Sequence, residues 1–222
     1  MDVLAYEDRM KDEDCYRALA SLVKEDTLVV GGVQMTGHIW GTIRPSEANL
    51  LDVNMGLEIP TALGLAMALP HRKVLCIVGD GSTMFNMGNL VQMAWTPANN
   101  LSVFIMDNSC WVGFTEYPSP TLALTDLEAV AKGSGLKNTR MVWTLDDFRQ
   151  AASESLERNE LSVVVSKIRW TPFPRPIWCK DGQENKYVFA RYIERTEHKR
   201  ILRPYGFPFG EYNIMGVAEE KS

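Results

Sequence analysis

The chain has 222 residues, which suits one α/β domain of ordinary size with an additional segment and is too short for a large multidomain enzyme. Hydrophobic residues make up 45% of the sequence and charged residues 23%, so a disordered or collagen-like chain is excluded. The 23 basic residues stand against 28 acidic ones, and the net charge of −5 gives no basic footprint for nucleic acid. We therefore expect a folded protein that binds neither DNA nor RNA.

The cysteines and the N-terminal segment bear on compartment and metal binding. No two of the four cysteines stand at a short metal-ligand spacing: Cys15, Cys76, Cys110 and Cys179. Neither a zinc site nor a cysteine-ligated iron–sulfur cluster is indicated, and we expect reduced, intracellular thiols. The acidic N-terminus lacks the pattern of a signal peptide, and the longest apolar stretch, 59–70, is shorter than the about 20 residues that cross a bilayer. These features predict a cytoplasmic protein without a membrane span.

The first part of the chain is predicted to form helix, strand, polar loop, helix and strand in turn. The segments are 12–24, 27–31, 32–52, 56–69 and 73–78. The helix predicted over 56–69 is rich in Ala and Leu, which suits a buried helix, and Pro60 falls in its first turn, where proline is tolerated.

The second part continues the alternation, beginning with a helix and ending with a strand. The segments are 83–95, 101–106, 126–132, 139–142, 145–156 and 161–165. Strands that alternate with helices predict an α/β fold, with an open, mostly parallel sheet that carries helices on both faces. We assign residues 1–167 to this domain.

Residues 168–222 differ in composition and are predicted to form a C-terminal arm and a charged tail. The segment Trp170–Trp178 contains three prolines and several aromatic residues, so it is predicted to be an extended arm and not an inner strand. The segment Glu184–Arg203 mixes charged and aromatic residues, and it is expected to form a helix or a strand that packs on this domain or on a partner subunit.

Polar and glycine residues follow three of the predicted strands. The three strand ends are Gly31-Gly32-Val33-Gln34, Gly79-Asp80-Gly81-Ser82 and Asp107-Asn108-Ser109-Cys110. In open parallel sheets ligands bind at the carboxyl ends of the strands, where glycines let backbone N–H groups approach a ligand. A helix that begins near Thr83 favours a diphosphate, and the oxygens of Asp80 and Asn108 suit Mg²⁺. Because the chain has neither a G-x-G-x-x-G fingerprint nor a Walker lysine, generic nucleotide binding is disfavoured.

These residues resemble a known family. Gly79-Asp80-Gly81-Ser82, followed by Asp107-Asn108, is similar to the signature of the thiamine-diphosphate-dependent enzymes, and Asn54–Leu57 is similar to the segment before that signature. The resemblance covers about residues 15–165. Within the family it is nearest to the small sulfopyruvate and phosphonopyruvate decarboxylases, and particularly to the cofactor-binding (beta) subunit of the two-subunit sulfopyruvate decarboxylase.

The resemblance implies roles by position. It implies that Mg²⁺ is held by the Asp80 and Asn108 side chains and the Cys110 carbonyl. It implies that thiamine diphosphate is contacted by Gly32, Val33, Gln34, Val53, Met55, Gly79, Gly81, Ser82, Asn108 and Cys110. Of these, Met55 would hold the cofactor in its bent form, and the Val53 carbonyl would accept from the pyrimidine amino group. The core is an equally ordinary place for a methionine such as Met55.

Two further residues are candidates for proton transfer. His38 lies in the predicted loop near the site and could relay protons, although a loop histidine is more often a surface group. Glu116 could act as an acid or base, or it could be a solvated loop residue. Glu116 also belongs to Gly113–Thr121, which is bulkier than the glycine-rich stretch of other family members, so the substrate side chain stays open.

The chain has no room for the pyrimidine-binding domain of the single-chain enzymes. The resemblance therefore implies a separate pyrimidine-binding subunit that supplies the activating glutamate, in an α2β2 or higher assembly. The expected function is the diphosphate-binding subunit of a decarboxylase of small 2-oxo acids, inactive alone. The alternatives are an acetolactate-synthase-like carboligase subunit, and a non-catalytic assembly or regulatory subunit that retains the fold.

Overall fold

The computed structural model describes residues 6–33, 35–96, 98–111, 117–171 and 181–202. The strands are β1 Met10–Lys11, β2 Leu28–Gly32, β3 Asn49–Val53, β4 Val74–Gly79, β5 Leu101–Asp107, β6 Thr139–Val142 and β7 Ser162–Arg169. The α-helices are α1 Asp12–Leu22, α2 Met35–Ile43, α3 Glu58–Ala68, α4 Asp80–Phe85, α5 Gly88–Trp95, α6 Leu127–Gly133, α7 Leu145–Glu157 and α8 Gly182–Glu197. Short 3₁₀ turns cover Tyr6–Asp8 and Pro120–Leu122.

The strands form one parallel sheet in the order β1-β7-β5-β4-β2-β3, and β6 also pairs with β7. β4 lies between β2 and β5, and every residue of β5 is buried. Continuous apolar runs such as Val74-Leu-Cys-Ile-Val78 are typical of strands that are covered on both faces. The predicted α/β fold with an open parallel sheet is confirmed.

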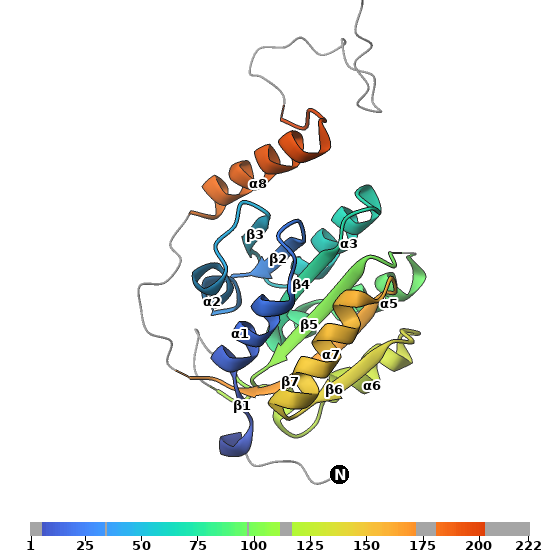
Figure 1. Cartoon of the computed structure of the whole chain (residues 1–222). Helices are drawn as coiled ribbons and strands as arrows, with labels where there is room; N and C mark the ends of the chain where they lie inside the picture. The colour runs from blue at the N-terminus through green and yellow to red at the C-terminus, as the bar shows by residue number, and fades with distance from the viewer. Residues whose placement is uncertain (1–5, 34, 97, 112–116, 172–180, 203–222) are drawn as a thin grey trace, which may run out of the picture.

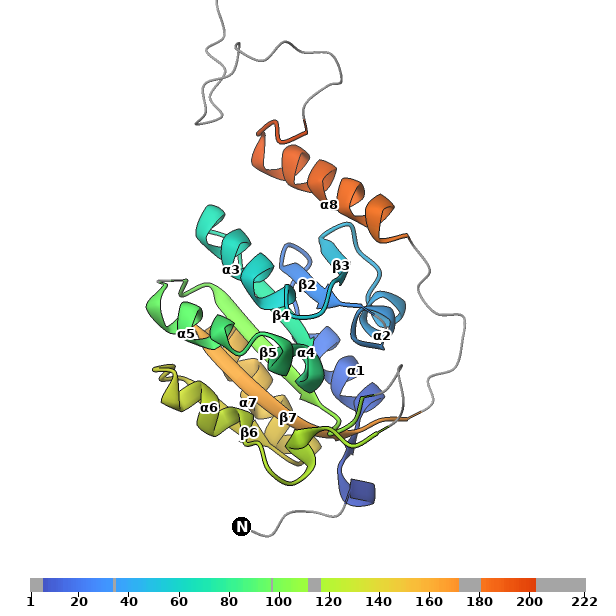
Figure 2. The same ribbon diagram turned by 180° about the vertical axis from the view of Figure 1, so that it is seen from behind.

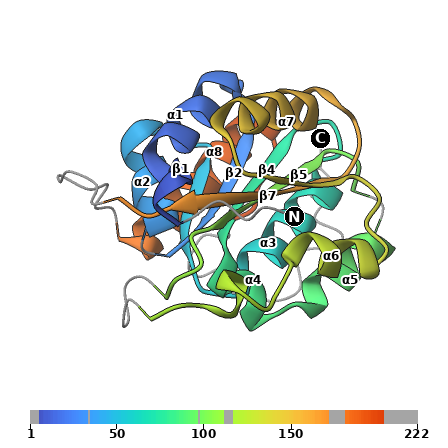
Figure 3. The same ribbon diagram turned by 90° about the horizontal axis from the view of Figure 1, so that it is seen from below.

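Helices cover both faces of the sheet (Figures 1 and 2). Buried side chains of α1, α2 and α7 pack on one face, and those of α3, α5 and α6 pack on the other. Figure 3 shows the layers from below, with α1 and α7 on one side of the sheet and α3 to α6 on the other. Caps fix where the helices start: the side chains of Asp126 and Thr144 accept backbone N–H groups at the first turns of α6 and α7.

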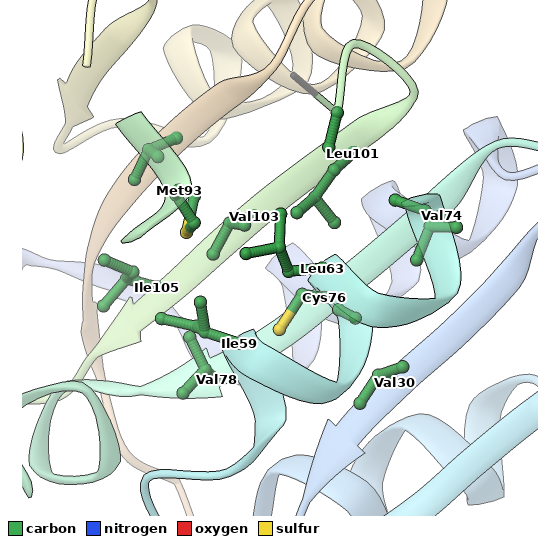
Figure 4. Packing of buried hydrophobic residues seen from close by; sticks show 14 of the residues in the cluster. Val30, Ile59, Leu63, Val74, Cys76, Val78, Met93, Leu101, Val103 and Ile105 are labelled. Carbon is green, nitrogen blue, oxygen red and sulfur yellow. The ribbon is translucent and has the colours of Figure 1, made fainter. Parts of the chain in front are cut away.

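The centre of the core lies between α3 and the middle strands. Ile59 and Leu63 of α3 face Val78 of β4 and Val103 of β5, with Met93 of α5 beside them (Figure 4). The helix thus buries a side of small and branched apolar residues against the sheet. Its N-terminal end, just after Gly56, is held at the carboxyl end of β4.

α8 covers the edge of the sheet at β3 (Figures 1 and 2). Phe189 and Ile193 are buried there, and the Asn185 side chain bonds the backbone of the strand. Its Oδ1 accepts from the Leu51 N–H at 2.7 Å, and its Nδ2 donates to the Asn49 carbonyl at 3.0 Å. Of the alternatives left open for Glu184–Arg203, the structure therefore has a helix packed on this domain.

The prediction of a polar loop over 32–52 is wrong, because the segment contains α2 and β3. α2 has the sequence MTGHIWGTI, in which glycine and β-branched residues give a weak helical propensity. Burial of Ile39 and Trp40 stabilises the helix instead, and Trp40 Nε1 donates to Asn49 Oδ1 of β3 at 3.2 Å. β3 is short and contains Asp52, whose φ of 63° is unusual in a strand.

The single helix predicted over 83–95 is also wrong, since α4 and α5 are separate helices. α4 begins at Asp80, earlier than the expected start near Thr83, and ends at Phe85. Asn86 and Gly88 have low helix propensity, and the break lets the Asn86 and Asn89 side chains donate to the Gly56 carbonyl. The break therefore ties α5 to the start of α3.

The remaining predicted helices and strands before Lys167 are present within a few residues of the expected ends. β7 continues four residues past the predicted end at Val165 and pairs with β1, which the sequence pattern did not predict. Most of the predicted arm, residues 172–180, lies outside the described residues, as does Cys179. Cys15 and Cys76 are buried free thiols. No helix in the described part of the chain has both the length and the apolar character that a membrane crossing requires.

Candidate functional site

The site lies where the chain changes direction in the sheet. After β2 the chain runs outward to β3, and after β4 it runs to β5 on the other side. The carboxyl ends of β2 and β4 therefore form a topological switch point, the usual ligand position in open α/β sheets. A small pocket that is open to solvent lies at this point. Its described lining residues are Val33, Met35, Thr36, Met55, Glu58, Gly79, Asp80, Gly81, Ser82, Asn108, Cys110 and Trp111.

Asp80 is one of two buried carboxylates in the described lining of the pocket and is only 2% exposed. Ser119 Oγ donates to Asp80 Oδ2 at 2.6 Å, and Thr121 Oγ1 lies 3.0 Å from the same oxygen. Burial, and after it the negative charge of Asp107, raises the pKa of Asp80 to about 6. Hydroxyl groups that hold one oxygen of a carboxylate orient it, as outer-shell groups do for metal ligands.

Asn108, Ser109 and Cys110 form a tight turn at the end of β5. Ser109 has a φ of 56°, and Asn108 Oδ1 accepts from the Cys110 N–H at 2.9 Å. The Ser119 N–H donates to the Ser109 carbonyl at 2.9 Å, so the turn is also fastened to the segment that bonds Asp80. This arrangement brings the amide of Asn108 to the same pocket as the carboxylate of Asp80.

A buried ion pair supports the turn from behind. Lys167 Nζ lies 2.7 Å from Asp107 Oδ2 and also donates to the Thr121 carbonyl at 2.8 Å. Arg9 Nη1 donates to Ser109 Oγ at 2.9 Å, across 100 positions of sequence. Two cations therefore stand behind a site that contains two close carboxylates, Asp80 and Asp107.

Met55 and Gly56 form the wall contributed by the start of α3. Gly56 has a φ of 79°, which glycine adopts without strain, and its N–H donates to Ser82 Oγ at 2.7 Å. Its carbonyl accepts from Asn89 Nδ2 at 2.9 Å. Met55 thus precedes a residue whose backbone is fixed on both sides, and its side chain lines the pocket.

Glu58 is a second carboxylate in the lining, 1% exposed. Ser82 Oγ lies 2.7 Å from both of its oxygens. Burial raises the pKa of Glu58, against the opposing effect of the Ser82 hydroxyl and of nearby backbone groups. The carboxylate is therefore buried at the first turn of α3 and is held by the Ser82 hydroxyl.

Trp111 closes the pocket on the side of β5. A Cβ placed on Gly81 would lie 2.6 Å from the Trp111 ring, so the ring sits against the backbone of the Gly79–Ser82 segment. Phe85 packs edge-on against the same ring, with 6.0 Å between centroids. Trp111 thus adds an aromatic side chain to a pocket that Met55 also lines.

The structure brings together most, but not all, of the residues that the sequence singled out. Gly32 lies behind the lining, because a Cβ there would meet Glu58 Oε1 at 2.4 Å. The Val53 carbonyl already accepts from the Val33 N–H at 3.0 Å. His38 belongs to α2 and is not among the described lining residues. Gln34 and Glu116 lie outside the described residues.

Four described lining residues were not predicted: Met35, Thr36, Glu58 and Trp111. A signal existed for Glu58, since it is the one charged residue in GLEIPTALGLAMAL, an otherwise apolar segment at a predicted site. Met35 and Thr36 fell in the segment assigned to a loop. Trp111 carries no sequence signal that separates it from an ordinary surface or core aromatic.

The segment that forms the pocket also matches a known protein family. Residues 30–166 match the family described as "Thiamine pyrophosphate enzyme, C-terminal TPP binding domain". The chain belongs to this family. The match spans β2 to β7 and so contains every lining residue of the pocket.

Relatives within the thiamine pyrophosphate enzymes cover much of the chain. It is 28% identical over 155 residues to "Sulfopyruvate decarboxylase subunit beta" of Methanocaldococcus jannaschii, covering 69% of this chain and 81% of that protein. It is 33% identical over 145 residues to the protein of the same name from Methanococcus maripaludis, covering 65% and 77%.

A solved structure shares the fold. It is the Rhodococcus jostii RHA1 thiamine diphosphate-dependent 4-hydroxybenzoylformate decarboxylase, with a TM-score of 0.60 and 16% identity. The match covers 78% of this chain and 35% of that one, so this chain spans about a third of the solved structure. The predicted family and fold are confirmed, and the domain that binds thiamine pyrophosphate is the part of the family present here.

The donor set of the pocket fits a hard cation next to a diphosphate. Asp80 and Asn108 offer oxygen ligands, which Mg²⁺ prefers, and the Asp80 carboxylate is already oriented by the Ser119 hydroxyl. Thr121 Oγ1 lies near both Asp80 and Asp107 but has one proton, so it can donate to only one of the two carboxylates. A cation at Asp80 would offset the repulsion between these carboxylates.

Proposed function

We propose that this chain is the diphosphate-binding subunit of a two-subunit thiamine-diphosphate-dependent decarboxylase of small 2-oxo acids, similar to the sulfopyruvate and phosphonopyruvate decarboxylases. The observation that carries the proposal is the pocket at the switch point, which joins Asp80 and Asn108 from neighbouring strand ends with Met55 from the start of α3. The relatives named as a beta subunit support the two-subunit form.

The proposed metal ligands are Asp80, the Asn108 side chain and the Cys110 carbonyl, with Mg²⁺ as the ion. Gly79, Gly81 and the Ser82 backbone would contact the diphosphate, and the turn that follows Gly32, at Val33 and Gln34, would contact the diphosphate or the pyrimidine. Bound thiamine diphosphate supplies an electron sink for cleavage of the bond between a carbonyl carbon and a carboxylate.

The chain's own residues would orient the cofactor and exclude water. Met55 would hold the cofactor bent, because its side chain is flexible but its backbone precedes the fixed Gly56. Trp111 would cover the diphosphate side of the pocket. The Val53 carbonyl has one lone pair left after its bond from Val33, which suffices for an amino group. His38 and Glu116 remain candidates for proton transfer.

The activating glutamate would come from a separate pyrimidine-binding subunit, so the complete active site would lie between subunits in an α2β2 or higher assembly. The pocket would supply metal ligands and a diphosphate cradle, and the buried Glu58 carboxylate is bonded to the Ser82 hydroxyl. We therefore expect the chain to bind the cofactor and to have little activity alone.

The first test determines which subunits and which cofactor the native assembly contains. The assembly would be purified from its source cells and weighed by native mass spectrometry, with bound thiamine diphosphate and a second polypeptide of domain size as the expected result. A homo-oligomer with neither would contradict the proposal. The assembly would then be given sulfopyruvate, phosphonopyruvate and pyruvate, and product analysis would separate an aldehyde from a ligation product.

The second test examines Asp80 as the proposed metal ligand. Asp80→Ala should abolish Mg²⁺-dependent binding of thiamine diphosphate while circular dichroism shows the fold intact. Asp146→Ala, which removes an exposed carboxylate at the start of α7, is the control and should bind as the wild type does. Retained binding in Asp80→Ala would refute the assignment of the site.

A further inference from the structure

Ser82 cannot serve a diphosphate with its hydroxyl proton in this structure. Its Oγ donates to the Glu58 carboxylate and accepts from the Gly56 N–H, each at 2.7 Å. A hydroxyl group has a single proton, and a diphosphate offers only acceptors. The hydroxyl of Ser82 is therefore committed within the protein, and only its backbone N–H is left for the ligand.

Glu58 joins three segments of the pocket. Its side chain comes from the first residue of α3, and its carboxylate accepts from the Ser82 hydroxyl in the first turn of α4. It also occupies the space beside Gly32, at the end of β2, where a Cβ would come within 2.4 Å of Oε1. Since its exposure is only 1%, Glu58 is buried in the wall of the pocket and is not a solvated surface group.

We propose that Glu58 is a positioning residue, which acts through Ser82 and Gly56 to fix the start of α3 against the start of α4, and so fixes Met55 relative to the metal ligand Asp80. The role in cofactor binding rests on the proposed function. Glu58 directs the Ser82 proton toward itself, and this leaves the Ser82 oxygen facing the Gly56 N–H. Gly56 follows Met55 directly, so the position of Met55 depends on this chain of two hydrogen bonds.

Glu58→Gln tests the role with little change of shape. The glutamine carbonyl can still accept a hydrogen bond, but its NH₂ group replaces a carboxylate oxygen that lies 2.7 Å from Ser82 Oγ, so the arrangement around Ser82 is lost. Ser82→Ala removes the link itself. Gly32→Ala leaves Glu58 and Ser82 unchanged chemically but forces the carboxylate to move.

The first readout needs no cofactor. Amide hydrogen exchange at Gly56 in the full-length chain should become about tenfold faster in Glu58→Gln as well as in Ser82→Ala. Unchanged exchange at Gly56 in Glu58→Gln, with the normal melting temperature, would overturn the positioning role, because it would mean that Ser82 holds Gly56 without help from Glu58.

The second readout is the affinity for thiamine diphosphate with Mg²⁺, followed by tryptophan fluorescence since Trp111 lines the pocket. Each of Glu58→Gln, Ser82→Ala and Gly32→Ala should weaken binding about tenfold, and the Glu58→Gln/Ser82→Ala double variant should bind no more weakly than either single variant. Additive effects, or a loss confined to Ser82→Ala, would overturn the proposal and assign the Ser82 hydroxyl to the diphosphate.

A matched control lies on α7, where Ser153 Oγ donates to Glu157 Oε1 at 2.8 Å on the exposed surface. Ser153→Ala/Glu157→Gln should leave both readouts unchanged. If Glu58→Gln does not fold, Ser82→Ala and Gly32→Ala still decide the outcome by the same two readouts. A wild-type chain that binds no thiamine diphosphate, either alone or in its native assembly, would overturn the proposed function, whatever the exchange at Gly56 shows.

Discussion

At the scale of single residues, Asp107 and Lys167 form a buried ion pair behind the pocket. Their side chains are 1% and 5% exposed, and Lys167 also donates to Ser109 Oγ and to the Thr121 carbonyl. Such a pair adds little stability compared with apolar residues, but removing one partner leaves an uncompensated buried charge. Replacing either partner alone should therefore destabilise the turn that follows β5.

We predict that Lys167→Ala lowers the free energy of unfolding by about 3–5 kcal/mol, because Asp107 is left buried and unpaired. Chemical denaturation of the full-length chain measures this change. Lys132→Ala, which breaks the exposed pair with Glu128, should cost at most about 1 kcal/mol. A loss as small as the control's for Lys167→Ala would show that Asp107 does not need its cation.

The sequence predicts the residues of the pocket unevenly. Asp80 and Asn108 could be found because each follows an apolar strand directly and the strands are neighbours. Glu58 and Trp111 reach the pocket through the angle of α3 and through the turn at Ser109, and neither angle nor turn geometry is encoded in a residue pattern. Glu58 stood out only as a charge in an apolar segment.

At the scale of elements, α8 and β3 depend on each other. β3 is an edge strand, and edge strands carry unpaired backbone groups that other chains can bind. Asn185 bonds both an N–H and a carbonyl of β3, and Phe189 and Ile193 bury apolar surface beside it. A helix from the C-terminal part of the chain thus protects a strand from the N-terminal part.

Asn185→Ala should therefore leave the Leu51 N–H and the Asn49 carbonyl without their partner and cost about 1–3 kcal/mol. Hydrogen exchange at Leu51 should become faster at the same time. Gln183→Ala, at an exposed position in the first turn of the same helix, serves as the comparison and should change neither quantity. Unaltered exchange at Leu51 would mean that β3 is held without α8.

The C-terminal end of α8 is fastened by an ion pair that responds to acid. Burial acts to raise the pKa of Glu197, but the bonds from Arg72 and His71 outweigh it and hold the pKa below the ordinary 4.5. Since the pKa is lowered in the folded state, the pair stabilises the protein above pH 4.5, and this contribution disappears as the pH falls through the lower, folded-state value.

Glu197→Gln should accordingly flatten the loss of stability of the wild type below pH 4.5, because the variant has no carboxylate to protonate at this point. Thermal unfolding measured between pH 3 and pH 7 gives the comparison. Glu184→Gln, exposed in the first turn of α8, should keep the acid limb of the wild type. If the Glu197→Gln curve had the same acid limb, the dependence would belong to other groups.

The elements that sequence reasoning missed have a common physical cause. α2 and β3 lack strong local patterns and are stabilised by packing, through Ile39 and Trp40 in one case and α8 in the other. The strands β4 and β5 were predictable because both faces are covered, which demands continuous apolar runs. Patterns of apolar residues in the sequence therefore predict the central strands of such a sheet better than its edge strands.

For the whole molecule, binding at the pocket should stabilise the entire sheet, because the lining residues come from the ends of β2, β4 and β5 and from α3. We predict that thiamine diphosphate with Mg²⁺ at 100 times its dissociation constant raises the free energy of unfolding by about 2.7 kcal/mol. Addition of EDTA should remove the effect. A shift of equal size with thiamine diphosphate alone would contradict the role of the metal.

The pairing of β1 with β7 has a consequence for how the protein is made. Met10 pairs with Ile168, and Arg9, the residue before β1, donates to Ser109 Oγ in the turn after β5. During synthesis the N-terminal segment leaves the ribosome first, yet its partner strand leaves only after nearly all of the sheet has been translated. The bond from Arg9 to this turn can therefore form only after β7 has been translated, so a nascent chain stalled before β7 carries an unfinished site.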